Sequence, residues 1–195
     1  MSQLRMLYLA EGRTPPACPA LPDGYVLRPY RDGDFPGYAR LRVAAGFAPP
    51  WDAVAFANYR CCLVPDGLML TFAPDGTPVA AASAEINTKA LWPHNGTLGW
   101  VAADPAHRGK GLGKATVAAA MRRLLQYGFR TLWLSTDDWR EPALAIYLKL
   151  GWQPLLADDD HRARWEQVFA KLALPSVPLL TTPPPNGPAY THLST

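Results

Sequence analysis

The feature that most constrains this chain is a glycine-rich turn, Arg-Gly-Lys-Gly-Leu-Gly-Lys, at positions 108–114. Glycines at alternate positions let the backbone turn tightly and approach a ligand closely, because they carry no side chain. A helix-prone stretch over residues 112–127 follows at once. The first amides of a helix have no partner within it, and the helix dipole favours negative charge there. Arg108, Lys110 and Lys114 add positive charge, so we expect the turn to bind a phosphate or pyrophosphate.

Two common phosphate-binding loops do not match this turn. The P-loop needs Gly five residues before its Gly-Lys pair and Ser or Thr after it, but these positions hold Arg108 and Ala115. The dinucleotide fingerprint needs a third glycine where the chain has Lys114. The turn instead resembles the coenzyme A loop of GNAT-type N-acetyltransferases. That loop has Arg or Gln, two residues, Gly, one residue, then Gly or Ala, which Arg108, Gly111 and Gly113 match.

The segment after residue 130 predicts a strand followed by a helix. Residues 132–136, Leu-Trp-Leu-Ser-Thr, are typical of a short buried strand. Asp138 and Glu141 have the spacing of a capping box, and Pro142 would lie in the first helical turn, where its missing N–H is tolerated. The helix should end at Gly151, and its apolar stripe is expected at Ala143, Ile146 and Leu150.

This helix carries a second resemblance to the same family. Residues 145–152, Ala-Ile-Tyr-Leu-Lys-Leu-Gly-Trp, resemble the GNAT helix whose tyrosine faces the coenzyme sulfur. Residues 98–105 are similar to the family's fourth strand, and a looser likeness extends from residue 25 to residue 155. The resemblance implies an α/β chain with the GNAT acyltransferase fold, a central mixed β-sheet of about six to seven strands flanked by helices. Arg140 departs from the pattern, since many members carry there an asparagine that contacts the coenzyme arm.

The resemblance also implies an activity, the transfer of acetyl from acetyl-coenzyme A to an amine by direct attack in a ternary complex. Tyr147 is then the candidate general acid, because the reference pKa values of a phenol and a thiol are close enough for proton transfer. Glu85, on a predicted strand, is the candidate general base, acting through a water. The residues implied in coenzyme binding are Val101 and Ala103 beside the pantetheine arm, and Arg108, Gly109, Lys110, Gly111, Leu112, Gly113 and Lys114 around the pyrophosphate.

Other functions remain open at this point. The transferase could use another acyl group or a hydroxyl acceptor. A different class is a coenzyme-A-binding sensor or regulatory module without catalysis. The acceptor, a small-molecule or peptide amine, is not identified by the sequence. Aromatic Phe47, Trp51, Phe56 and Tyr59 point to an apolar or aromatic substrate, although core packing explains them equally well.

Composition excludes several partners. The net charge is only +3, and its cations gather at the turn, so we expect no nucleic acid. No apolar run approaches the roughly 20 residues of a membrane span, and residues 1–12 lack signal-peptide features.

The cysteines are three in number, at positions 18, 61 and 62, and they fit a cytoplasmic protein. The histidines, at 94, 107, 161 and 192, have no metal-ligand spacing, so no metal is expected. A homodimer is left open.

The expected organisation is an N-terminal extension and linker (1–22), the acetyltransferase domain (23–173) and a proline-rich tail (174–195). The extension should hold an added edge strand at residues 4–9. The tail contains six prolines and should be extended, docking weakly or not at all. Within the domain we expect strands at 25–30, 68–72, 79–86, 97–103 and 152–155, a helix capped by Asp32 or Asp34 that runs towards Val43, and further helices within 48–62 and over 161–172.

Overall fold

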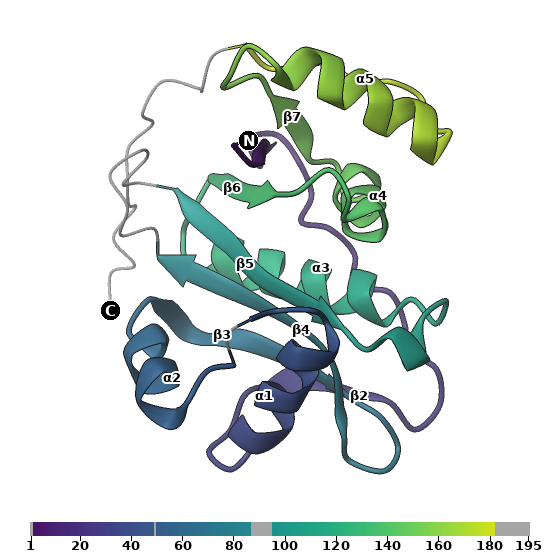
Figure 1. Ribbon diagram of the computed structural model, residues 1–195. Helices are drawn as coiled ribbons and strands as arrows, with labels where there is room; N and C mark the ends of the chain where they lie inside the picture. The colour runs from purple at the N-terminus through teal and green to yellow at the C-terminus, as the bar shows by residue number, and fades with distance from the viewer. Residues whose placement is uncertain (1, 49, 87–94, 182–195) are drawn as a thin grey trace.

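The computed structural model describes residues 2–48, 50–86 and 95–181 (Figure 1). Within them, one sheet is built from β1 (Leu4–Leu9), β2 (Val26–Pro29), β3 (Leu63–Phe72), β4 (Pro78–Ile86), β5 (Gly96–Ala103), β6 (Thr131–Thr136) and β7 (Gln153–Leu155). The helices are α1 (Phe35–Ala44), α2 (Ala53–Arg60), α3 (Leu112–Gln126), α4 (Glu141–Lys149) and α5 (His161–Leu172), with a short 3-10 turn, η1 (Pro105–His107), before α3.

The seven strands lie in the order β2-β3-β4-β5-β6-β1-β7. Strands β5 and β6 are parallel, and the other neighbouring pairs are antiparallel. The connection between the two parallel strands is α3, as a parallel pair requires a crossover. This is the predicted mixed sheet flanked by helices, and the fold prediction is confirmed.

The position of β1 corrects one expectation. The strand was expected at an edge, but it lies inside the sheet, paired with β6 along its full length and with β7 at Arg5–Leu7. Leu4, Met6 and Leu7 are fully buried, because both faces of an interior strand are covered. The strand is therefore integral to the sheet, and we propose that the domain begins at Leu4 instead of residue 23.

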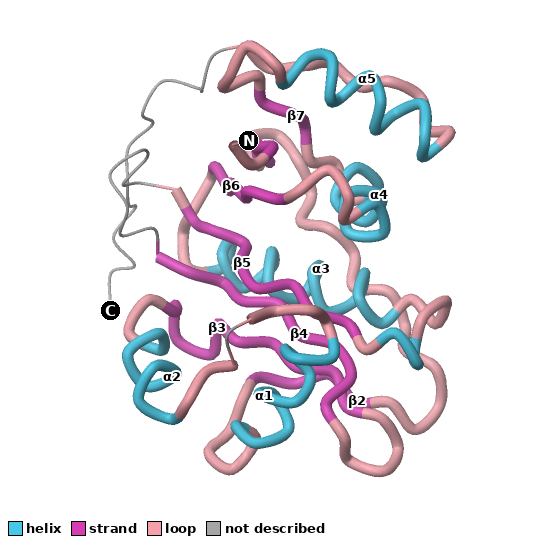
Figure 2. Tube along the Cα trace, viewed as in Figure 1, coloured by secondary structure: helices cyan, strands magenta, loops and turns pink. Residues whose placement is uncertain are grey.

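Helices cover both faces of the sheet, as Figure 2 shows. On one face α1 and α2 pack over β3 through Tyr38, Leu41, Phe56, Leu68 and Leu70. On the other face lies α3, whose residues Val117, Ala120, Met121 and Leu124 are fully buried. Successive side chains of β3 point to opposite faces of the sheet, so neighbouring residues of the strand pack against different helix layers. Leu70 belongs to the α1 and α2 side, whereas the next residue, Thr71, is hydrogen-bonded at 2.7 Å to Thr116 of α3.

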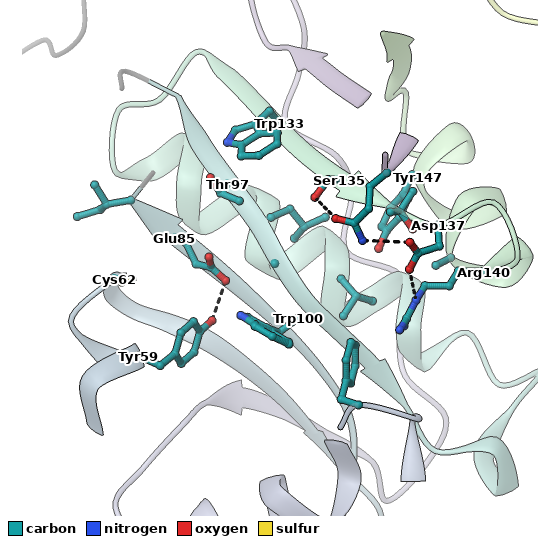
Figure 3. Close-up of a pocket in the computed structure, with 18 residues that line it drawn as sticks. Tyr59, Cys62, Glu85, Thr97, Trp100, Trp133, Ser135, Asp137, Arg140 and Tyr147 are labelled. Carbon is teal, nitrogen blue, oxygen red and sulfur yellow. Dashed lines mark hydrogen bonds and ion pairs between the residues drawn. The ribbon is translucent and has the colours of Figure 1, made fainter. Parts of the chain in front are cut away.

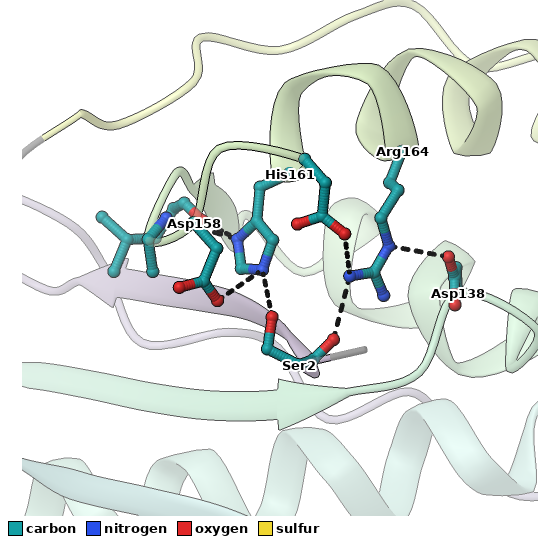
Figure 4. A network of polar contacts seen from close by, with 8 residues as sticks. Ser2, Asp138, Asp158, His161 and Arg164 are labelled. Atoms are coloured by element: carbon teal, nitrogen blue, oxygen red, sulfur yellow. Dashed lines mark hydrogen bonds and ion pairs between the residues drawn. The ribbon is translucent and has the colours of Figure 1, made fainter.

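A polar network ties Ser2, two residues before β1, to α5 (Figure 4). His161 is fully buried, and its Nε2 lies 3.3 Å from both Ser2 Oγ and Asp158 Oδ2. Arg164 donates to the carbonyl oxygen of Ser2 at 2.9 Å and to Asp138 Oδ2 at 2.9 Å. These bonds fasten the start of the interior strand to the helix that follows the sheet.

The same network explains why the expected capping box is wrong. Helix α4 begins at Glu141 with Arg140 at its N-cap, which forms no side-chain cap bond. Asp138 is instead bonded to Arg164, and this hydrogen bond lowers the pKa of the Asp138 carboxyl. Pro142 lies in the first turn as predicted. The buried face of α4 is formed by Leu144 and Tyr147, whereas Ala143 and Ile146 of the predicted stripe are only partly buried. Leu150, the third predicted residue, is buried in the core at the end of the helix.

The beginning of the tail is docked. The backbone of Leu180 is hydrogen-bonded to the two residues that flank Leu155, the last residue of β7. Its N–H donates to Pro154 O at 2.9 Å, and its carbonyl oxygen accepts from Leu156 N at 2.8 Å. Val177 and Leu179 pack against the main hydrophobic core. The expectation of weak docking is therefore wrong for residues 174–181, while residues 182–195 lie outside the described part of the chain.

The remaining elements follow the predictions closely. Strand β4 and helices α2, α3 and α5 form where expected, whereas β3 begins at Leu63, five residues earlier than the expected strand at 68–72. Asp34 precedes α1 but makes no cap bond with its side chain, because that carboxylate pairs with Arg28 at 2.7 Å. Across the described ranges, none of the helices combines the length and apolar character that a membrane crossing demands.

Candidate active site

The candidate site lies where β5 and β6 separate. The two strands pair only at Gly96–Leu132 and Thr97–Trp133, and they diverge beyond these positions (Figure 2). A pocket of about 460 Å³ opens between them. Figure 3 shows it with its lining residues, which come from the sheet, α2, α4 and the segments around them: Gln3, Phe47, Tyr59, Cys62, Glu85, Ile86, Thr97, Leu98, Gly99, Trp100, Val101, Trp133, Ser135, Thr136, Asp137, Arg140, Ala143 and Tyr147.

Strand β5 bulges at the pocket. Its register with β4 shifts, since Ser83 pairs with Gly99 whereas Ala81 pairs with Ala102. One residue of β4 therefore faces two residues of β5, the arrangement of a β-bulge. Trp100 lies in this bulge with φ of +44°, a conformation that bulky residues rarely adopt. Gly99, Trp100 and Val101 all line the pocket.

The bulge is followed by an open strand edge. After Thr97, the side of β5 that faces β6 makes no ladder bond to that strand within the described residues. An unpaired strand edge offers amides and carbonyls to an extended ligand. The predicted arm-binding residues Val101 and Ala103 lie along this edge, and Ala103 is exposed.

Glu85 stands on one wall of the pocket, at the end of β4. Its Oε1 accepts hydrogen bonds from Tyr59 Oη at 2.8 Å and Ser83 Oγ at 2.5 Å. A side chain at position 99 would collide with this carboxylate, so Gly99 is what allows Glu85 to lie directly against the bulge. Burial, and then the charge of Glu85, raise the pKa of Tyr59 well above its ordinary value, which keeps the phenol protonated as a donor.

Tyr147 stands on the opposite wall (Figure 3). It comes from α4, is only 5% exposed and lies with its ring centroid 6.2 Å from that of Trp152. Burial raises the pKa of Tyr147 far above the ordinary value, and the positive charge of Arg140 opposes this in part. A carboxylate and a protonated phenol thus face one pocket from opposite sides, an arrangement that can take a proton at one end and give one at the other.

A chain of hydrogen bonds forms another part of the lining. Ser135 donates to Gln3 at 3.0 Å, Gln3 donates to Asp137 at 3.2 Å, and Arg140 donates to Asp137 at 3.3 Å. Gln3 immediately precedes the interior strand β1, so that strand positions a pocket residue. The Arg140 guanidinium also lies 4.6 Å from the ring centroid of Phe47.

The glycine-rich turn leads into α3 as predicted. Gly109 and Gly111 have φ of +79° and +75°, and the space where a side chain would point is open at both positions. Gly113 is different: a Cβ there would lie 3.3 Å from Ile146 Cδ1, so this glycine also brings α3 close to α4. Lys110 donates to Tyr25 Oη at 2.7 Å.

The structure brings together the predicted residues Glu85, Val101 and Tyr147, which line one pocket. The predicted turn residues 108–114 do not line it; they lie beyond the end of β5, at the start of α3. Leu112 is buried in the core, so only its backbone could meet a ligand. The roles assigned to all of these residues stay predictions.

Several lining residues were not predicted. The sequence around Gln3 and Trp133 does not mark them as pocket residues, because they reach the pocket only through the pairing of strands that are distant in sequence. Trp100 lies in the segment 98–105 whose family resemblance was noted, but nothing in the sequence indicated a bulge there. Of the four aromatics noted in the sequence, Phe47 and Tyr59 line the pocket, Phe56 is a core residue, and Trp51 packs against that core.

No group of three or more His, Cys, Asp or Glu side chains is placed to hold a metal ion in the described part of the chain. His94 and His192, which were considered as ligands, lie outside it.

Comparison with known proteins agrees with this geometry. The family model described as "Acetyltransferase (GNAT) family" matches residues 24–152, well over half of the chain. The chain belongs to this family. Its curated GNAT relatives include a mycothiol acetyltransferase of Actinosynnema mirum, 29% identical over 150 residues that make up 73% of this chain and 49% of the relative. A second, from a Nocardioides species, is 29% identical over 188 residues, 84% of this chain and 61% of the relative.

A solved GNAT structure supports the fold. The GCN5-related N-acetyltransferase of Sphaerobacter thermophilus is 21% identical, with a TM-score of 0.63 over 79% of this chain and 49% of that one. The chain thus spans about half the length of that protein and of the Actinosynnema relative. The GNAT family and fold predictions are confirmed.

Proposed function

We propose that the protein is an acetyl-coenzyme-A-dependent N-acetyltransferase. The observation that carries the proposal is the placement of Glu85 and Tyr147 on opposite walls of one pocket, beside the bulge of β5. Family membership supports acetyl transfer, and the names of the two mycothiol acetyltransferase relatives agree with it. Because the chain covers only part of those relatives, its own activity is a proposal.

The residues of the turn and of β5 fit the coenzyme. The open space above Gly109 and Gly111 leaves room for a pyrophosphate against the first amides of α3. Arg108 and Lys114 add positive charge, and Lys110 is held towards Tyr25. The free edge of β5 at Val101 and Ala103 can bond the pantetheine arm as an added strand would. When bound, acetyl-coenzyme A supplies an activated acetyl group as a thioester.

Glu85 would act as the base. Its carboxylate, held by Tyr59 and Ser83, takes a proton from the acceptor amine, directly or through a water. The neutral nitrogen can then form a bond to the thioester carbonyl carbon as the carbon–sulfur bond breaks, and the nitrogen releases its second proton to water as the amide forms. A backbone amide of the bulge, at Trp100 or Val101, would stabilise the negative charge that develops on the carbonyl oxygen.

Tyr147 would complete the transfer by giving its proton to the departing thiolate. Its raised pKa means that the phenol is protonated throughout the neutral range, which is the form required of a donor, although burial also makes it a weaker acid than an exposed tyrosine. Arg140, whose charge favours the phenolate, would ease this step. The products are an amide and the free thiol of coenzyme A.

The acceptor is proposed to be a primary amine of a small molecule or peptide. The carboxylate of Glu85 suits an ammonium group, and the rings of Tyr59, Trp100 and Trp133 give the pocket aromatic walls. The substrate of the mycothiol acetyltransferases is a reasonable first candidate because of the relatives' names. A cytoplasmic location and a homodimer remain predictions from the sequence.

The test is release of coenzyme A thiol when the protein is incubated with acetyl-coenzyme A and a panel of amines that includes the substrate of those relatives. Turnover with at least one amine, strongly reduced in a Glu85→Gln variant, is the expected result. Tight coenzyme binding without turnover on any amine or alcohol would favour the sensor function instead.

A further inference from the structure

Arg42 is a buried cation beside the pocket. It lies on α1, one turn after Tyr38 and next to Leu41, on the stripe of the helix that faces the core. Only 2% of its surface is exposed, and it ranks among the largest fully enclosed side chains of the described chain. A position with this burial would ordinarily hold an apolar residue.

Aromatic rings surround the guanidinium. Its central carbon lies 3.5 Å from the ring centroid of Trp51, 4.1 Å from that of Trp100 and 5.1 Å from that of Phe47. The Trp51 and Trp100 rings meet at 69° with centroids 4.8 Å apart, so the cation occupies the corner between two indoles. Cation–π attraction is strongest for Trp and for desolvated cations.

The charge of Arg42 has no acidic partner. No described carboxylate forms an ion pair with it, and the positions outside the described ranges contain no Asp or Glu. Its Nε and Nη1 are buried and make no hydrogen bond of good geometry among the described residues. The polar group nearest in effect is the hydroxyl of Tyr38, whose pKa burial raises and the nearby Arg42 lowers in part, and this hydroxyl is neutral and brings no negative charge. A buried group of this kind destabilises a fold, and an apolar side chain of similar volume is often neutral or stabilising in its place. Stability therefore does not explain the choice of arginine.

The geometry points to Trp100. This tryptophan holds a positive φ of +44° within the β5 bulge, and such a strained conformation persists only where surrounding contacts impose it. Arg42 contacts the Trp100 indole. Trp100 and its neighbours Gly99 and Val101 line the pocket, and Gly99 lies against Glu85. Displacing the indole would shift the bulge, and with it the backbone amides proposed to stabilise the carbonyl oxygen.

We propose that Arg42 is a positioning residue that holds Trp100 in its positive-φ conformation and thereby fixes the β5 bulge for acetyl transfer. The proposal rests on the proposed function, because the bulge matters most to a reacting thioester. The cation acts through the indole and touches no substrate. Arginine suits this task better than lysine, since its planar guanidinium can stack on aromatic faces.

The central test is Arg42→Met, which keeps the length of the side chain and removes the charge. We expect kcat to fall about 10²-fold, as for small displacements of reacting groups, with the KM for acetyl-coenzyme A nearly unchanged and Tm equal or higher. Arg42→Lys should recover only part of kcat. Arg40→Met, an exposed position on the same helix, is the matched control and should behave as wild type. Full kcat in Arg42→Met, or a Tm loss that accounts for its inactivity, would overturn the proposal.

Two further measurements separate this proposal from the proposed function. In a crystal structure of Arg42→Met, residue 100 should leave the positive-φ region; retention of the wild-type φ would overturn the positioning role. In a Trp100→Gly background, Arg42→Met should have little additional effect on kcat, because the contact it removes is already gone. If wild-type protein releases no coenzyme A with any amine, the proposed function fails, but the φ at position 100 and the Tm values still decide the role of Arg42.

Discussion

The hydroxyl of Tyr59 donates a hydrogen bond of 2.8 Å to Oε1 of Glu85, which joins α2 to the end of β4 on one wall of the pocket. Tyr59 is itself fixed by Trp51, whose ring centroid lies 4.6 Å away. The carboxylate therefore has a defined orientation supplied by a helix that is otherwise mostly exposed. Changes in α2 should consequently alter catalysis without altering the coenzyme turn.

Glu85→Gln should lower kcat/KM for the amine by about 10²- to 10⁴-fold, the contribution expected of a general base. The amide keeps the size of the side chain and an acceptor oxygen for Tyr59, so the fold should persist. Steady-state rates and calorimetric affinity for acetyl-coenzyme A would measure both effects. Glu166→Gln, exposed on α5, is the control. A Glu85→Gln enzyme with wild-type rates at every pH would remove Glu85 from the mechanism.

Tyr147→Phe should lower kcat while leaving coenzyme affinity nearly unchanged, because the lost hydroxyl acts mainly in the transition state. The size expected for a proton donor is again about 10²- to 10⁴-fold. Tyr8→Phe is a matched control: Tyr8 is buried and its ring centroid lies 6.0 Å from Trp152, close to the 6.2 Å of Tyr147. If the Tyr147→Phe enzyme retains full kcat when chemistry limits the rate, the tyrosine has only a packing role.

The raised pKa of Tyr147 predicts the alkaline side of the pH–rate profile. A donor must be protonated, and burial holds this phenol protonated to a higher pH than the ordinary tyrosine value of about 10. The value of kcat should therefore show no decline from loss of this proton below about pH 10. Stopped assays with an acceptor at saturating concentration would measure it. A decline near pH 8 that disappears in Tyr147→Phe would contradict the assignment.

Gly111→Val should abolish stabilisation by acetyl-coenzyme A. A β-branched residue is strained at φ of +75°, and its side chain would fill the open space proposed for the pyrophosphate. In wild type, a ligand at about one hundred times its Kd contributes roughly 2.7 kcal/mol, a Tm increase of about 5 to 10 °C for this size. Gly12→Val, with φ of +68° and open surroundings, controls for backbone strain. A normal shift in the Gly111→Val protein would contradict the location of the coenzyme site.

Deleting residues 175–195 should lower stability but preserve coenzyme binding. The deletion removes the bonds of Leu180 to β7 and the packing of Val177 and Leu179, contacts worth about 2 kcal/mol if they resemble one buried apolar side chain. Thermal unfolding with and without acetyl-coenzyme A would separate the two effects. Deleting only 182–195 leaves these contacts intact and serves as the comparison. Loss of coenzyme binding in a folded 175–195 deletion would place the tail in the site.

Local signals predicted the parts of the molecule that short segments determine. The turn at 108–114, the strand at 79–86 and the helix carrying Tyr147 each depend on neighbouring residues, and each forms near its expected position, although the helix lacks the expected cap. Tertiary contacts decided the rest. Asp138 has the sequence of a cap, but Arg164, 26 positions later, takes its carboxylate. Residues 4–9 gave a loose strand pattern, which indicates a strand but not its neighbours in a sheet. Arg42 could have been noticed as the charged member of the apolar stripe of α1.

The interior position of β1 means that the sheet can be completed only late in folding. Its residues pair with partners as distant in sequence as Leu155, so this strand cannot complete its ladders until synthesis has passed that residue. Pairings of such long range close slowly, because the entropy of a large loop is lost before any contact compensates for it. During that wait the apolar residues of β1 are uncovered and open to intermolecular association. Synthesis rate and chaperone supply should therefore influence the yield of active protein more strongly than the stability of the finished fold would suggest.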